Sequence, residues 1–109
     1  MKRLLFVTLL SLAALSSVAA EGEITLVIEN HTFSPKEVKV PAGKKFKLLV
    51  VNKDASPAEF ESKPLSREKL IPAKSTATIL LGPLKPGRYA FVEEYHETQA
   101  GAQGTIVVE

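Results

Sequence analysis

The sequence predicts an all-β domain, a Greek-key antiparallel β-sandwich of seven to eight strands. Three observations predict this fold class. Short runs rich in β-branched residues recur about every eight to twelve residues and are separated by Pro, Gly and Asn. Beyond residue 20, no stretch of about eleven residues repeats its apolar positions with the 3.6-residue period of a helix. The length of 109 residues suffices for one small domain only.

The first four expected strands each combine a β-type pattern with a turn signal at the end. Residues 23–29 (EITLVIE) alternate and are followed by turn-forming residues. Residues 37–40 (EVKV) alternate and end at a Pro-Ala-Gly turn. Residues 45–51 (KFKLLVV) change from alternating to continuously apolar, as expected for a strand in the middle of a two-layer core. Residues 59–62 (EFES) direct Phe60 inward.

The last four expected strands follow the same rule. Residues 67–71 end at a proline, and residues 76–81 (TATILL) lead into a segment too rich in Gly and Pro for regular structure. Residues 88–93 (RYAFVE) and 105–108 (TIVV) flank a polar loop. The inward positions of all these segments predict a core made of Ile24, Leu26, Ile28, Phe33, Val38, Val40, Phe46, Leu48, Val50, Phe60, Leu70, Ile79, Leu81, Tyr89, Phe91, Ile106 and Val108.

Residues 1–20 have the pattern of a secretory signal peptide. Lys2 and Arg3 precede an apolar run over 4–15, and small residues follow it up to Ala20. The run is shorter than the roughly 20 residues that a membrane-spanning helix needs. We therefore expect cleavage after Ala20 and a domain over 21–109 that does not span a membrane, most simply in a bacterial periplasm.

Composition excludes several functional classes. Without Lys2 and Arg3, the chain has 12 Lys+Arg and 12 Asp+Glu, so its net charge is zero. A chain without excess positive charge is not expected to bind nucleic acid. There is no Cys, and the only Met is Met1, so the domain offers no sulfur ligand and is a poor host for Cu(I). The sequence shows no Ser-His-Asp constellation, phosphate-binding glycine loop or dinucleotide motif. We therefore expect that the protein is not an enzyme.

Five motifs in order resemble the cupredoxin family across the whole domain. They are FSP at 33–35, VKVPAG at 38–43, LVVNKD at 49–54, LKPGRYAF at 84–91 and GTIVV at 104–108. The resemblance implies the Greek-key sandwich already predicted from the strand pattern.

Three further segments resemble the small cysteine-free periplasmic cupredoxins, which are similar to the cupredoxin domains of bacterial iron-uptake proteins. These segments are EFES at 59–62, REK at 67–69 and EEYHE at 93–97. This resemblance implies a role in iron or copper acquisition beside a membrane permease.

The ligands of an electron-transfer cupredoxin are missing. By the family pattern, Ala58 stands where the first His is expected, Glu93 where the Cys is expected, and Ala102 where the Met is expected. Of the four copper ligands, His96 alone remains. A type 1 copper centre, and hence a blue-copper electron carrier, is excluded by this ligand chemistry.

Strand parity places one carboxylate inside the fold. Tyr89, Phe91 and Glu93 share a face of their strand, and the two aromatic residues identify that face as the core side. A carboxylate that faces the core needs a cation or a shell of hydrogen-bond donors. Glu59 and Glu61 share the face opposite Phe60 and form an acidic pair.

The cupredoxin resemblance implies that the loops carrying these acidic residues meet at one pole. Glu59 or Glu61 is then expected to meet Glu93 or Glu94 and His96 in a mixed oxygen and imidazole cluster. The predicted metal-binding residues are Glu93, His96, Glu59, Glu61, Glu94, Glu97 and Glu68.

Several of the polar residues in these segments also have a purely structural explanation. Alternating Glu59 and Glu61 are typical of a solvated edge strand. Glu68, between Arg67 and Lys69, is simply explained by exposed ion pairs. His31 follows Asn30 in a turn, where a capping or turn role is the default. Whether His31 or Glu68 binds metal stays open at this point.

The donor types restrict the metal. Carboxylates with imidazole favour Cu(II), iron, Zn(II) or Mn(II), and the Irving–Williams order makes Cu(II) the tightest binder. The leading hypothesis is a periplasmic protein that binds copper(II) or iron for capture or transfer. The alternative is a metal-free interaction module whose acidic end docks onto a permease or another periplasmic protein.

Overall fold

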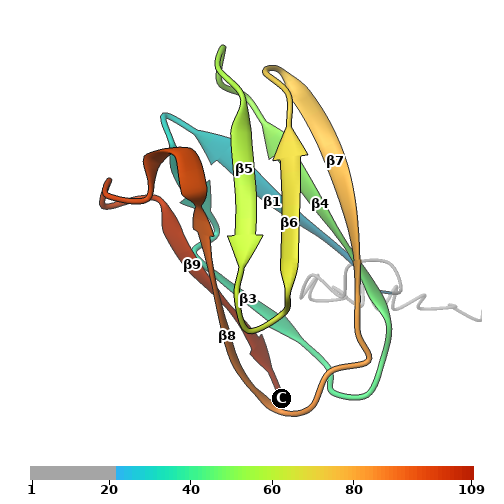
Figure 1. Ribbon diagram of the computed structural model, residues 1–109. Coiled ribbons are helices and arrows are strands. Elements are labelled where there is room, and N and C mark those ends of the chain that lie inside the picture. The colour runs from blue at the N-terminus through green and yellow to red at the C-terminus, as the bar shows by residue number, and fades with distance from the viewer. Residues whose placement is uncertain (1–21) are drawn as a thin grey trace, which may run out of the picture.

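Residues 22–109, the part of the chain that the computed structural model describes, contain nine strands in two sheets packed face to face (Figure 1). The first sheet has the order β2 (Thr32–Ser34), β1 (Glu23–Glu29), β4 (Phe46–Asn52), β7 (Ser75–Leu81). The second has the order β3 (Glu37–Val40), β9 (Gln103–Val108), β8 (Gly87–Glu93), β5 (Ala58–Ser62), β6 (Arg67–Ile71). The predicted signal peptide, residues 1–20, lies outside the described residues.

The predicted fold class is confirmed, with one strand more than expected. The additional strand is β2, whose three residues lie among turn-forming residues and therefore gave no strand pattern. Two strand pairs, β1 with β4 and β3 with β9, are parallel, and the other five pairs in the described residues are antiparallel. The chain passes into the second sheet as β3 before it returns to the first sheet as β4, which allows β1 and β4 to run in the same direction.

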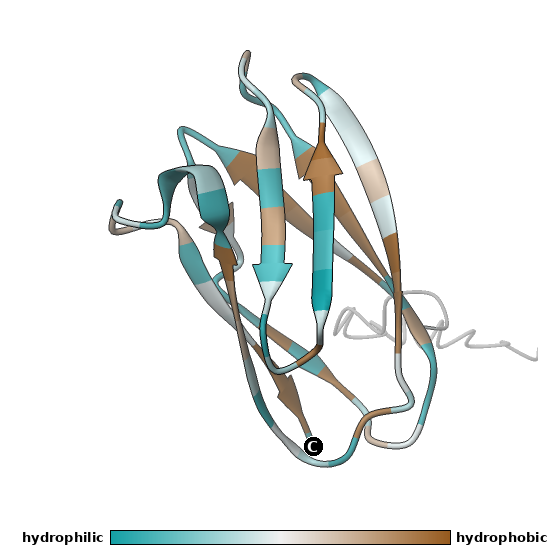
Figure 2. Ribbon diagram, in the orientation of Figure 1, coloured by the Kyte–Doolittle hydropathy of each residue, from teal (hydrophilic) through white to brown (hydrophobic). Residues whose placement is uncertain are grey.

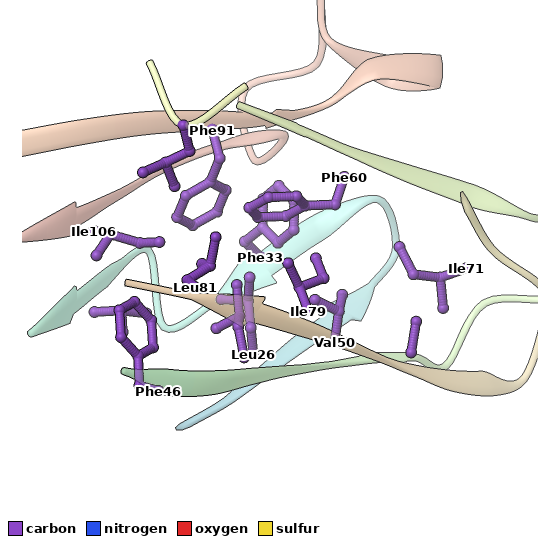
Figure 3. Packing of buried hydrophobic residues seen from close by; sticks show 14 of the residues in the cluster. Leu26, Phe33, Phe46, Val50, Phe60, Ile71, Ile79, Leu81, Phe91 and Ile106 are labelled. Carbon is purple, nitrogen blue, oxygen red and sulfur yellow. The ribbon is translucent and has the colours of Figure 1, made fainter. Parts of the chain in front are cut away.

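The core lies between the sheets and includes every predicted residue except Leu70 (Figure 3). Buried apolar residues that were not predicted are Ala58, Leu65, Ile71, Ala77 and Ala102. Leu70 is 50% exposed, and its neighbour Ile71 is fully buried instead, opposite buried Ala58 in the β5–β6 register. The strand β6 is hydrophilic except for its last two residues, Leu70 and Ile71 (Figure 2). Because these two apolar residues are adjacent, the sequence did not indicate which of them points into the core. Ile24 and Tyr89 are partly buried and pack against the core.

Three buried phenylalanines lie on the strands that lead to the candidate site. The ring of Phe91 makes an edge contact with Phe33 at a centroid distance of 4.8 Å and stacks on Phe60 at 5.1 Å. Such aromatic pairs add stability beyond the area that they bury. They fix β2, β5 and β8 relative to one another close to the polar residues described below.

Helical structure is minor in the described residues. After β8 the chain makes the short 3₁₀ turn η2 (Glu94–His96), seen at the same end of the sandwich as the β1–β2 turn (Figure 1). Within residues 22–109, no helix combines the length and apolar character that crossing a membrane requires.

Candidate metal centre

Glu93 is a fully buried carboxylate at the end of β8. Its inward direction, predicted from strand parity, is confirmed. Oε1 accepts hydrogen bonds from the backbone N–H groups of Glu59 at 2.9 Å and Tyr95 at 3.1 Å, and Oε2 is hydrogen-bonded to Nδ1 of His96. The buried carboxyl group of Glu93 therefore has the hydrogen-bond partners that a buried polar group needs.

His31 completes a three-residue cluster with Glu93 and His96. Each of the three offers one ligand atom, and these atoms lie within 4.8 Å of one another. The imidazole rings of His31 and His96 stack with a centroid distance of 3.6 Å and an interplanar angle of 16°. The two His side chains are 30% and 25% exposed, so the cluster has a buried carboxylate and a rim of two imidazoles that solvent reaches.

The turn between β1 and β2 presents His31. Glu29 pairs with Thr32, so Asn30 and His31 form a two-residue hairpin turn, and both have positive φ angles, 54° and 57°. Turns of this kind favour residues such as Asn and Gly, which tolerate the left-handed region. Phe33, two residues further, anchors the hairpin in the core.

His96 is the last residue of η2, and the loop that follows it approaches β2 closely. The carbonyl of Gly101 accepts the backbone N–H of Phe33 at 3.0 Å. A Cβ atom at Gly101 would lie only 2.3 Å from Oγ1 of Thr32, so glycine is needed here. The two chain segments that carry the stacked imidazoles are joined through this contact.

The stacked rings cannot both coordinate one ion without movement. A metal binds an imidazole nitrogen in the plane of the ring, at about 2.0–2.1 Å. Because the ring planes of His31 and His96 are nearly parallel, an ion in one plane lies well outside the other. For both imidazoles to bind one ion, one ring would therefore have to turn. His31 is held less tightly than His96, because its ring contacts a carboxylate only at 3.4 Å, from Nδ1 to Oδ2 of Asp54.

A second group of carboxylates lies next to the first on the outside of the second sheet. This outer acidic cluster consists of Glu59, Glu61, Glu68 and Glu94, each with a carboxylate oxygen within 4.8 Å of the others. Glu61 and Glu68 are register partners across β5 and β6. Like charges opposite each other on a sheet are destabilising when both are ionised.

Proximity in the outer acidic cluster raises the pKa of two of its members, Glu94 and Glu68. The pKa of Glu94 is raised to about 7. The largest cause is hydrogen bonding with the Glu59 side chain, and loss of hydration and the charges of Glu61, Glu59 and Glu68 add to it. Hydrogen bonding with Glu61 and the charges of Glu59 and Glu61 likewise raise the pKa of Glu68. Partial desolvation, with the charge of Glu59, raises the pKa of Tyr95.

The structure divides the predicted site residues between these two groups. Glu93 and His96 come together, while Glu59, Glu61, Glu68 and Glu94 form the outer acidic cluster. Glu59 reaches Glu93 through its backbone N–H group and not through its carboxylate. Glu97 is exposed and belongs to neither group.

His31 is the site residue that sequence reasoning did not include. The available signal was an Asn-His pair flanked by residues suited to a hairpin, but only the fold shows that this turn meets the loop after β8. The positions where the cupredoxin pattern expects His and Met are occupied by Ala58 and Ala102, both buried and both without donor atoms in their side chains. These residues do not fit a type 1 copper centre.

Comparisons with known proteins agree with the observed architecture. Residues 2–108 match the family model described as a cupredoxin-like domain. An uncharacterized protein of Rickettsia prowazekii (strain Madrid E) is 41% identical over 86 residues, which cover 79% of this chain and 67% of that protein.

Solved structures with the same fold share little sequence with this chain. The metal-binding domain of the Cu(I)-exporting P-type ATPase CopA of Streptococcus pneumoniae D39, with Cu(I), has a TM-score of 0.70 and 16% identity, over 80% of this chain and 84% of that one. Reduced auracyanin of Roseiflexus castenholzii has a TM-score of 0.67 and 19% identity, over 83% and 98% of the two chains. At these identities the similarity establishes the fold alone.

Proposed function

Because the chain belongs to the cupredoxin-like domain family, we propose that it is a periplasmic protein that binds a transition-metal ion, copper(II) or iron, for capture or transfer. The ligands in this proposal are the Glu93 carboxylate and the imidazoles of His96 and His31. The observation that carries the proposal is the fully buried Glu93 carboxylate beside two partly exposed imidazoles.

The donor set supports a borderline or hard ion. One carboxylate oxygen and two imidazole nitrogens suit Cu(II), Fe(II) and Zn(II), and Cu(II) binds tightest among them. Cu(I) prefers thiolate and thioether sulfur, which the sequence lacks beyond Met1. A Cu(I) ion is described for the similar CopA domain, so we expect the two proteins to differ in the oxidation state that they prefer.

The exposed rim supports capture or transfer. Both imidazoles reach solvent, and a turn of one ring would let both of them face the same ion. The signal-peptide pattern of residues 1–20 supports the periplasm as the location. The resemblance to iron-uptake cupredoxins suggests a membrane permease as the partner that exchanges the ion, and we propose a binding role and not catalysis.

Calorimetric titration with Cu(II), Fe(II) and Zn(II) tests the proposal. We expect Cu(II) to bind with a Kd of roughly micromolar or below. Glu93→Gln and His96→Ala should each weaken binding by more than the roughly 10–100-fold that outer-shell partners contribute. Glu97→Gln, which changes an exposed carboxylate outside both groups, is the matched control and should bind as the unaltered protein does. Equal affinities of all four proteins would refute the proposed site.

A second candidate function is docking to a basic partner without a metal. The outer acidic cluster favours it, because half-exposed Leu70 and Tyr95 lie beside Glu59 and provide apolar contact area. If the protein has this function, Cu(II), Fe(II) and Zn(II) should each bind with a Kd of roughly millimolar or weaker, or not at all, in the same titrations.

A further inference from the structure

The turn that presents His31 adopts a backbone conformation that the local sequence alone supports poorly. Asn30 and His31 both lie in the left-handed region. Asn and His are among the non-glycine residues that adopt this region most often, but two consecutive non-glycine residues in it are uncommon. An interaction from elsewhere in the fold is therefore expected to hold the turn.

Asp54, the only aspartate in the chain, provides that interaction. Its Oδ1 accepts the backbone N–H of Asn30 at 2.7 Å, and its Oδ2 accepts the backbone N–H of His31 at 2.9 Å. One carboxylate thus binds both amides of the turn. Although partial burial opposes ionisation, the hydrogen bonds from His31 and Asn30 and the charges of His31 and Lys74 lower the pKa of Asp54 on balance.

Asp54 is itself fixed by its neighbours. Its backbone N–H donates to Oδ1 of Asn52 at 3.0 Å, and its carbonyl accepts the backbone N–H of Lys74 at 3.0 Å. Asn52 is buried, and its amide nitrogen donates to the carbonyls of Ser56, Ile71 and Pro72. The carboxylate is therefore attached to the rigid end of β4.

We infer that Asp54 is the positioning residue that holds His31 in reach of the metal ion, an inference that rests on the proposed function. Both strong hydrogen bonds of Asp54 go to the backbone of the turn, so the ring of His31 is free to leave the stack while its Cα stays in place. The looser 3.4 Å contact with Nδ1 restricts the ring without fixing it. Carboxylates that orient a ligating histidine are common outer partners of metal sites.

The test combines a metal-free and a metal-loaded measurement on four variants, Asp54→Ala, Asp54→Asn, His31→Ala and the double variant Asp54→Ala/His31→Ala. In the metal-free protein, nuclear Overhauser contacts between the His31 and His96 rings report the position of His31. In the Cu(II)-loaded protein, pulsed electron paramagnetic resonance counts the imidazole ligands. Glu29→Gln, which changes an exposed carboxylate next to the turn, is the control.

We expect Asp54→Ala to lose the contacts between the rings, to show one imidazole ligand instead of two, and to bind Cu(II) roughly 10–100-fold more weakly. Asp54→Asn, which keeps one acceptor oxygen, should be intermediate and covers the case in which Asp54→Ala does not fold. In the His31→Ala background, Asp54→Ala should weaken Cu(II) binding no further, because Asp54 acts through His31.

Three outcomes would overturn the inference, each in a different way. If the unaltered protein binds no Cu(II), the proposed function fails and this inference fails with it. If Cu(II) binds and depends on Glu93 and His96, but Asp54→Ala and Asp54→Asn keep two imidazole ligands and full affinity, only the role of Asp54 is refuted. Equal weakening by Asp54→Ala with and without His31 would likewise refute it.

Discussion

Glu93 and Glu94 are consecutive in the chain but belong to different groups, one inside the sandwich and one outside it. Glu93 is fully buried and hydrogen-bonded to His96, whereas Glu94 joins the outer acidic cluster with Glu59, Glu61 and Glu68. Glu93 is the last residue of β8 and points into the core, whereas Glu94 begins η2, where the chain leaves the sheet. The two adjacent carboxyl groups therefore have different surroundings, and we expect them to respond differently to substitution.

The contribution of Glu94 to the free energy of unfolding should decrease as the pH rises. Its pKa is about 7 in the folded protein against the usual 4.5, so the folded state binds the proton more tightly than the unfolded state. The contribution of Glu94 is then fully present below about pH 4.5 and is lost as the pH rises through about 7. Glu94→Gln should reduce this loss, as measured by urea midpoints across that range. Glu97→Gln is the control, and an unchanged pH dependence in Glu94→Gln would contradict the assignment.

Glu93 should tolerate replacement by Gln better than by Leu. Gln keeps an oxygen that accepts the N–H groups of Glu59 and Tyr95, whereas Leu leaves both buried donors without a partner. Each unsatisfied buried group costs about 1–3 kcal/mol, so Glu93→Leu should be less stable than Glu93→Gln by about that amount or more. Urea denaturation of the metal-free protein measures the difference. Equal stability of the two variants would show that the hydrogen bonds to Glu93 contribute little.

Gly101→Ala should disturb the close approach between β2 and the loop that follows η2. The added Cβ atom would lie 2.3 Å from Oγ1 and 2.8 Å from Cβ of Thr32, so one segment must move. Such overpacking costs about 1–3 kcal/mol. We expect a lower Tm and weaker contacts between the His31 and His96 rings in nuclear Overhauser spectra. Adding Thr32→Ala removes the nearest atoms and should restore part of the loss; no restoration would mean that the clash lies elsewhere.

The side chains of Leu70 and Ile71 should differ sharply in their effect on stability. Ile71 is fully buried and Leu70 is half-exposed on the edge strand β6. Ile71→Ala should cost about 2–5 kcal/mol, whereas Leu70→Ala should change stability by about 0.5 kcal/mol or less. Chemical denaturation of the two variants under identical conditions compares them directly. A reversed order would mean that β6 presents its other face to the core.

Local patterns predicted most strands and the inward direction of Glu93, because alternation on a strand is a property of neighbouring residues. They did not predict β2, since three residues between turn formers are too few for a period. They left His31 open because its partners, His96 and Asp54, are distant in sequence and meet it only through the packing of β1, β2 and β4. The expected single cluster became two groups because Glu93 and Glu94 face opposite ways, so that only Glu93 reaches the imidazoles.

The two donors that hold Oε1 of Glu93 are peptide groups, supplied by residues 59 and 95. Any amino acid except proline carries such a group. Substitutions at these two positions can therefore change the outward charge and the aromatic ring while the Glu93 carboxyl group keeps both hydrogen bonds. The position of Glu93 inside the sandwich therefore does not depend on which side chains residues 59 and 95 present on the outside.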